Sequence, residues 1–305
     1  MKKPVKIFAL ILLVIAAFLV TAFFLLPQKT MQTSSKPKIA ASMFPVADIA
    51  RQIAGDSLDI VTILPRGASP HTYAASPSDL MKLQGSKAVF VIGHALDNWA
   101  SDLASDMPDS RVVTVDKGID LLKPDATILI GVGDGESGAD PHYWLSAENG
   151  KQIARNITDE LVNIEPEKEG IFRSNLSQFE DKMDTIDAEI KGLFKDKKNK
   201  KIVTHHDAWQ YFTKAYGLDW VGSIEPSPGK SLAPQELAKL QDLIVKDHIT
   251  TIFVEPQLDP QLSSTLAQDL KLKLITVDPT GSAEDTKTYD DLLKLNAERI
   301  AATLE

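Results

Sequence analysis

Cysteine is absent from this chain of 305 residues. A disulfide framework, a thiolate metal site, a thiol nucleophile and a cysteine-linked lipid anchor are therefore excluded for this sequence. Positive charge is also scarce, because 42 Asp and Glu residues outnumber 33 Lys and Arg residues and give a formal net charge of −9. Since phosphate binding needs a cationic surface, this balance disfavours nucleic acid as a partner.

One long stretch without any charge stands out at the N-terminus. Residues 7–26, IFALILLVIAAFLVTAFFLL, follow a segment that contains three lysines. A spanning helix needs about 17–25 residues, whereas the apolar part of a secretory signal has about 7–15. We therefore predict a membrane anchor over residues 1–26, with a cleaved signal as the alternative, and a polar tether over residues 27–37. The flanking lysines place the rest of the chain outside the cytoplasm, in the periplasm or at the outer face of the cytoplasmic membrane.

Short apolar runs rich in β-branched residues recur through the remaining chain, with helical stretches between them. Strands that are buried on both faces of a parallel sheet have this near-continuous apolar character. The runs are residues 38–44, 58–64, 88–93, 111–115 and 127–131 in the first half, and 201–205, 250–255 and 272–277 in the second. Their alternation with helices predicts the α/β class, with an N-terminal lobe over residues 38–165 and a C-terminal lobe over residues 200–305.

A single long helix is predicted between the lobes, within residues 166–199. Its apolar residues follow one another at steps of four and three, which places them in one stripe along the helix. They are Phe172, Leu176, Phe179, Met183, Ile186, Ile190 and Leu193. The spacing is also compatible with the seam of a coiled-coil dimer. A rigid helix packed across both lobes fits better, because only three heptads are present.

Histidine is rare, and three of the six histidines share a context with one aspartate. His71 follows the second predicted strand, His142 the fifth, His206 ends the first strand of the second half, and Asp278 follows the last strand. Ligands of parallel sheets collect at the carboxyl ends of the strands, so these four side chains are candidates for one site. Each has a simpler alternative: a loop histidine is more often a surface residue or a helix cap, and Asp-Pro-Thr-Gly is usually a turn.

The other three histidines are predicted to lie outside this site. His205 precedes His206 on an extended strand, so the two side chains point to opposite faces. His94 and His248 lack the proline and strand-end context and are interpreted as structural. Three imidazoles and one carboxylate form a tetrahedral ligand set that favours zinc, because manganese prefers more oxygen ligands.

Several motifs together resemble the zinc/manganese-binding proteins that serve bacterial ABC importers. They are SPHTYAASPSDL, DPHYWLSAEN, HDAWQYFTKAYGL, EPSPGKSLAPQELAKL, IFVEPQLDPQL and VDPTG, in the family's order from about residue 38 to the C-terminus. The resemblance implies two α/β lobes joined by one long rigid helix, with the metal held in the cleft between them. It also implies that His71, His142 and His206 are ligands and that Asp278 is the fourth. Members tuned to manganese tend to have a glutamate at the position of His206, so the resemblance favours zinc.

The expected function is therefore that of a non-enzymatic, monomeric extracytoplasmic receptor that passes Zn²⁺ to a membrane permease. A manganese receptor of the same family is one alternative. A zinc hydrolase is another, with Glu255 as the general base and an open fourth position for water. A metal-stabilised adhesion module is the third. In the receptor, Glu255 is expected to hold the second nitrogen of a ligand histidine, although a plain strand-end salt bridge is equally compatible with the sequence.

Overall fold

A computed structural model describes residues 36–123 and 138–305 of the chain. The predicted anchor, all but the end of the tether and the predicted strand over residues 127–131 lie outside these described residues. Within the described ranges, no helix has the length and apolar character that a bilayer span requires. The description below concerns the compact unit formed by residues 36–305.

The first sheet lies in the N-terminal lobe and has four parallel strands in the order β2-β1-β3-β4. The strands are β1 (Lys38–Ala41), β2 (Asp59–Thr62), β3 (Ser86–Val91) and β4 (Arg111–Thr114). Helices α2 (Phe44–Ala54), α3 (Pro77–Leu83) and α4 (Asn98–Ser105) cover it, with a 3-10 turn, η1 (Gly55–Ser57), after α2. Ile39 and Ala41 of β1 join one hydrophobic cluster and Ala40 joins another, because neighbouring strand residues point to opposite faces. The central strands β1 and β3 are thus buried on both faces.

The second sheet repeats this topology in the C-terminal lobe, with the parallel order β6-β5-β7-β8. Its strands are β5 (Lys201–His206), β6 (Asp219–Glu225), β7 (Thr251–Val254) and β8 (Lys273–Thr276), and its helices are α7 (Gln210–Tyr216), α8 (Pro234–Lys246) and α9 (Gln261–Leu270). Strand β6 was not predicted. It is an edge strand of mixed polarity, DWVGSIE, and therefore lacks the continuous apolar run of an interior strand. Its register against β5 also shifts next to Gly222.

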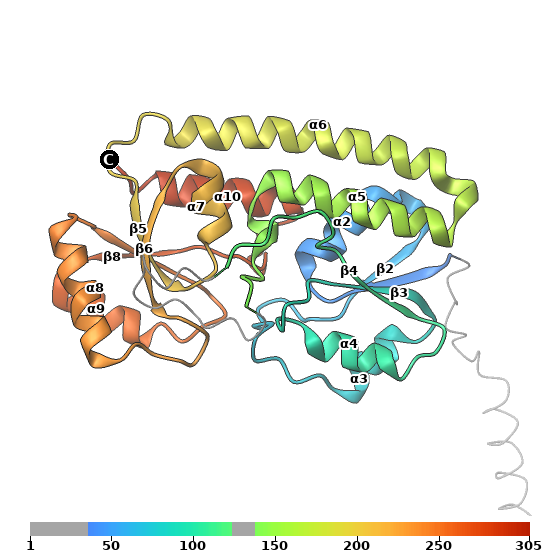
Figure 1. Ribbon diagram of the computed structural model, residues 1–305, viewed down its shortest axis with the longest axis horizontal. Coiled ribbons are helices and arrows are strands. Elements are labelled where there is room, and N and C mark those ends of the chain that lie inside the picture. Colours follow the sequence, from blue (N-terminus) through green and yellow to red (C-terminus); the bar gives the residue numbers. More distant parts are fainter. Residues whose placement is uncertain (1–35, 124–137) are drawn as a thin grey trace, which may run out of the picture. The chain divides into compact units, whose positions relative to one another are not determined.

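Three more helices pack against the two lobes, and two 3-10 turns accompany them. The helices are α5 (Ala147–Ile164), α6 (Glu169–Phe194) and α10 (Tyr289–Ala301), and the turns are η2 (Tyr143–Leu145) and η3 (Pro166–Lys168). With 26 residues, α6 is roughly 39 Å long at 1.5 Å per residue. It packs against α2 and α5 on one side of the molecule and against α7 and α10 on the other, so it spans both lobes (Figure 1).

The apolar stripe of α6 is covered within the chain. Its buried residues are Phe172, Phe179, Met183, Ile186, Ile190 and Phe194. Leu176 of the predicted stripe is only partly buried against the same core. At the end of the stripe, Phe194 is buried and Leu193 is 38 % exposed. Because intramolecular contacts already bury the stripe, it does not serve as the seam of a coiled-coil dimer.

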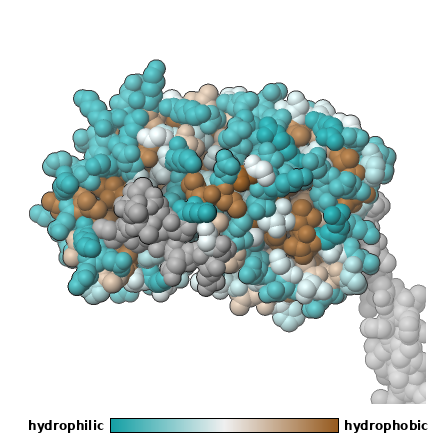
Figure 2. Space-filling view, viewed as in Figure 1, coloured by the Kyte–Doolittle hydropathy of each residue, from teal (hydrophilic) through white to brown (hydrophobic). Residues whose placement is uncertain are grey.

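The two lobes share one hydrophobic core. The largest cluster of buried residues contains Ile39 of β1 and Phe172 of α6 together with Phe253 of β7 and Tyr289 of α10. The surface in Figure 2 is mostly hydrophilic, with hydrophobic residues in separate small groups. The predicted α/β architecture, with two parallel sheets and one long joining helix, is confirmed.

Candidate metal site

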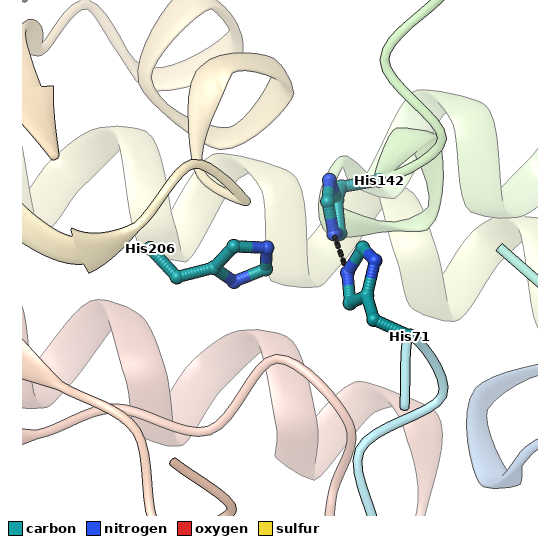
Figure 3. Close-up of side chains that lie close together, drawn as sticks. All are labelled: His71, His142 and His206. Atoms are coloured by element: carbon teal, nitrogen blue, oxygen red, sulfur yellow. Dashed lines mark hydrogen bonds between the residues drawn. The ribbon is translucent and has the colours of Figure 1, made fainter. Parts of the chain in front are cut away.

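Three of the four predicted ligands converge where the lobes meet. His71 lies in the loop after β2, His142 lies immediately before η2, and His206 is the last residue of β5. One ring nitrogen from each lies within 4.8 Å of the other two (Figure 3). Within the described ranges, this is the only group of three or more His, Asp or Glu side chains close enough to share a metal ion. Three segments that are distant in sequence thus build one all-nitrogen group.

The spacing of this group is that of a metal site. The Nε2 atoms of His71 and His142 are 3.2 Å apart. Two nitrogen ligands of one tetrahedral zinc ion, each about 2.05 Å from the metal, are roughly 3.3 Å apart. The ring of His206 lies with its centroid 4.9 Å from each of the other two rings. The His71–His142 pair already has the spacing of two zinc ligands, and the ligand atom of His206 lies within 4.8 Å of both.

His142 is oriented by the aspartate two residues before it. Oδ1 of Asp140 accepts hydrogen bonds from the backbone N–H of His142 at 2.9 Å and from its Nδ1 at 2.8 Å. Nε2 of His142 is thereby turned toward the other two histidines. Behind it, Ser146 is the N-cap of α5 and accepts a hydrogen bond from the N–H of Asn149. Burial raises the pKa of Asp140 to about 7, although the hydrogen bond from His142 opposes the shift.

His206 is oriented in the same way by Glu255, which follows β7. Nδ1 of His206 is 3.3 Å from both carboxylate oxygens, and Nε1 of Trp209 donates to Oε1 at 3.2 Å. Glu255 is buried and lines the same pocket as the three histidines. The expectation that Glu255 holds the second nitrogen of a histidine agrees with these contacts. Since a hydrogen bond at Nδ1 fixes the tautomer, the Nε2 lone pair is kept for a ligand.

The three histidines differ in their affinity for protons. Desolvation and the neighbouring rings hold the pKa of His71 and that of His142 well below the usual histidine value. Burial acts in the same direction on His206, but the carboxylates of Glu255 and Asp207 outweigh it and raise the pKa of His206. The group therefore contains two imidazoles that stay neutral at pH 7 and one that competes for a proton.

Asp278 does not join the three histidines. Its Oδ1 accepts from the N–H groups of Thr280 and Gly281 and from the Thr280 hydroxyl, at 3.0–3.1 Å. Its Oδ2 accepts from the hydroxyl of Ser282 at 2.9 Å and from the N–H of Ala283 at 2.8 Å. The buried carboxylate thus organises the loop that follows it, which is the turn role that an Asp-Pro-Thr-Gly sequence suggests. Its geometry gives no support to a place as the fourth ligand.

The remaining histidines lie outside the group, as predicted. His205 points to the other face of β5, where its Nδ1 is 3.2 Å from the Ser263 hydroxyl. Nε2 of His94 pairs with Asp116 at 2.9 Å. Asp140 was missed by the sequence reasoning, although its place two residues before a candidate ligand was a usable signal.

The pocket around the three imidazoles is lined by both lobes. Trp144 and Glu255 contribute to its wall, together with Pro279 and Thr280 of the loop after β8. The buried indole of Trp144 donates from Nε1 to the carbonyl of Pro279 at 2.8 Å, which closes one side of the pocket. His142 and His206 are buried, whereas His71 is exposed, so the pocket shields two of the three imidazoles from water. In this buried part of the site, the low dielectric strengthens the interaction between an ion and its ligands.

Comparison with known proteins gives the family. The family model described as "Zinc-uptake complex component A periplasmic" matches residues 39–303. The chain belongs to this family. It is 30% identical to the "Manganese ABC transporter substrate-binding lipoprotein PsaA" of Streptococcus mitis, an alignment that covers 100% of this chain and 99% of the relative.

Solved structures agree with this membership. A crystal structure of ZnuA matches with a TM-score of 0.78 and 26% identity, over 88% of this chain and 99% of that one. The AdcAII protein of Streptococcus pneumoniae matches with a TM-score of 0.78 and 25% identity, over 89% and 100%. Members of the family are metal-binding receptors of ABC importers and not enzymes, so this chain is such a receptor, with a membrane permease as its partner. The hydrolase alternative is thereby set aside.

Proposed function

We propose that this receptor captures Zn²⁺ with His71, His142 and His206 and delivers it to its permease. The proposal rests on one observation: every ligand atom in the group is an imidazole nitrogen. Neutral imidazole is a preferred zinc ligand, whereas manganese favours sites with more carboxylate, carbonyl and water oxygen. The nearby carboxylates of Asp140 and Glu255 hold the Nδ1 atoms of His142 and His206, although the buried Oδ2 of Asp140 has no hydrogen bond among the described residues.

A manganese receptor is the second candidate, because the Streptococcus mitis relative is described as a manganese protein. The two metals differ in the ligand atom that they prefer at the position of His206. A carboxylate there would give manganese the oxygen that it prefers, whereas an imidazole gives zinc a third nitrogen.

Metal analysis of the purified protein tests the proposal. After dialysis against equal concentrations of zinc and manganese, we expect close to one equivalent of zinc and little manganese. His206→Glu should weaken zinc binding by at least about tenfold and raise the share of manganese. His248→Asn is the matched control, since asparagine tolerates the left-handed backbone of that residue, and it should leave zinc binding unchanged. Manganese at one equivalent in the wild-type protein would overturn the zinc assignment.

We also propose that residues 7–26 hold the receptor at the outer face of the cytoplasmic membrane as a monomer. The length of this uncharged segment and the lysines before it support the proposal. Fractionation of cells that express the full chain should place it with the membranes, and removal of residues 1–35 should release it. Full release of the complete chain after export would instead favour a cleaved signal.

A further inference from the structure

The segment that carries His142 is attached to the opposite lobe by tyrosine hydroxyls. Tyr211, on α7 of the C-terminal lobe, accepts a hydrogen bond from the N–H of Leu122 at 2.8 Å. The same hydroxyl donates to the carbonyl of Asp140 at 3.1 Å. Asp140 is the residue whose carboxylate holds Nδ1 of His142. One hydroxyl from the second lobe therefore fixes the backbone from which a first-lobe ligand extends.

Two further tyrosines of the C-terminal lobe continue this attachment along the segment. The hydroxyl of Tyr289, on α10, donates to the carbonyls of Trp144 and Ser146. The hydroxyl of Tyr216, on α7, accepts from the N–H of Ala147 at 3.4 Å. These hydroxyls bind backbone groups, so they fix the path of the chain and not only the side chains.

The same helix also reaches the site from the other side. The residue before α7 is Trp209, whose indole donates to Glu255, and Glu255 holds Nδ1 of His206. Trp209, at the start of α7, thus contacts the carboxylate of Glu255, which supports His206. Tyr211 contacts the backbone of Asp140, whose carboxylate supports His142. We propose that Tyr211 is a positioning residue for metal binding, which sets His142 at its distance from His206 across the interface between the lobes.

The chemistry of the hydroxyl suits this role. Tyr211 is buried, and both its donor and its acceptor capacity are used. Burial raises the pKa of Tyr211, so the hydroxyl stays protonated and able to donate at every physiological pH. Phenylalanine would keep the ring in place against Tyr143 while leaving the N–H of Leu122 without this acceptor.

Zinc affinity of Tyr211→Phe, measured in the full chain against a competing chelator, tests the inference. We expect an affinity about three- to tenfold weaker, which is the effect of one lost buried hydrogen bond. The absorption spectrum of the Co²⁺-loaded variant should also change, because the ligand geometry changes. Thr213→Val is the matched control: it removes a buried hydroxyl from the same helix that donates only to Gln210 of that helix. Equal zinc affinity and cobalt spectrum in Tyr211→Phe and wild type, or an equal loss in both variants, would overturn the inference.

A double-mutant cycle separates this inference from the proposed function on which it rests. In a His142→Ala background, Tyr211→Phe should have no further effect on zinc affinity, because the ligand that it positions is gone. In a His71→Ala background it should keep its effect. If His142→Ala itself leaves zinc affinity unchanged, the proposed site is wrong. If His142→Ala weakens binding and Tyr211→Phe does not, only the positioning role fails. The melting temperature of each metal-free variant confirms that it is folded.

Discussion

Proton competition at the three imidazoles sets the pH range in which the receptor can hold its metal. A metal binds the neutral ring, so a protonated ligand must first release its proton. His71 and His142 have a lowered pKa and are neutral at pH 7, whereas the pKa of His206 is raised by Glu255 and Asp207 against the effect of burial. As pH falls, His206 is therefore the first ligand to be protonated. Zinc affinity should decrease from neutral pH toward pH 5, through His206 first.

Replacement of Glu255 tests this order. Glu255→Gln removes the charge that raises the pKa of His206, so the pH at which affinity starts to fall should move to lower values. At pH 8 the affinity should still be about 10–100-fold weaker, because a neutral amide is a weaker partner for Nδ1 than a carboxylate and leaves the ring a poorer ligand. Zinc dissociation constants between pH 5 and 8 check both effects.

The control for this experiment lies on the other face of β5. Glu225 pairs with His206 through the sheet backbone, but its carboxylate faces the ring of His205 at 3.5 Å, so Glu225→Gln should keep the wild-type pH profile. A profile that is unchanged in Glu255→Gln would show that Glu255 does not control the proton on His206.

At the scale of an element, the loop over residues 278–283 depends on one carboxylate. Asp278 accepts five hydrogen bonds from this loop and is 1 % exposed. Asp278→Asn should therefore lower the free energy of unfolding by about 2–3 kcal/mol, since bonds to a buried charge are lost. Zinc should still bind at one equivalent. Denaturant unfolding and metal analysis measure the two quantities.

An exposed aspartate provides the comparison. Asp259 accepts a hydrogen bond from the N–H of Gln261, and Asp259→Asn should cost well under 1 kcal/mol. Loss of zinc from a folded Asp278→Asn protein would return Asp278 to the ligand set.

Helix α5 contains a glycine that leaves no room for a side chain, because a tyrosine of the opposite lobe packs against it. A Cβ atom at Gly150 would lie 2.5 Å from the hydroxyl oxygen of Tyr289. Gly150→Ala should thus destabilise the protein by about 1–3 kcal/mol, although alanine is the better helix former. Gly192→Ala in α6 has no neighbour within 4 Å and should stabilise the protein slightly. Thermal melting of both variants compares them, and a stabilised Gly150→Ala protein would contradict the close approach of the Tyr289 side chain to α5.

On the scale of the whole molecule, the lobes are joined by more than the long helix. Arg66 of the first lobe donates to the carbonyls of Ala283 and Thr286 in the second. Gly281 packs so closely on Phe44 that a Cβ atom there would lie 2.4 Å from the ring. Each lobe has a smaller hydrophobic cluster of its own, but the largest cluster and these contacts cross between the lobes.

Calorimetry should accordingly record one unfolding transition for the two lobes. The proposed zinc site lies where both lobes meet, so zinc should raise the transition temperature of the whole unit. At a free concentration 100 times the dissociation constant, the stabilisation should be about 2.7 kcal/mol. Two separate transitions, or a shift of one lobe alone, would contradict the shared core.

The local hydrophobic pattern was sufficient to predict the buried strands and the long helix. The apolar runs of β1, β3, β5 and β7 and the stripe of α6 identified the α/β class and the joining helix, since burial imposes a period on each. The edge strand β6 was not predicted from the sequence, because an edge position requires less apolar surface and tolerates Gly222. At the end of α6, heptad spacing favoured Leu193, but the packing of the second lobe buries Phe194.

The sequence by itself determined which side chains could meet. His71 follows β2 and His206 ends β5, and parallel sheets bring strand ends to one edge, whereas the strand predicted before His142 lies outside the described residues. Only the tertiary structure decided where each polar group points. The carboxylate of Asp278 turns into its own loop, and those of Asp140 and Glu255 turn to imidazoles, because hydrogen-bond partners from several segments compete for each oxygen. A side chain's position along the chain fixes its neighbourhood, but the partner that it binds depends on backbone groups that folding brings from elsewhere.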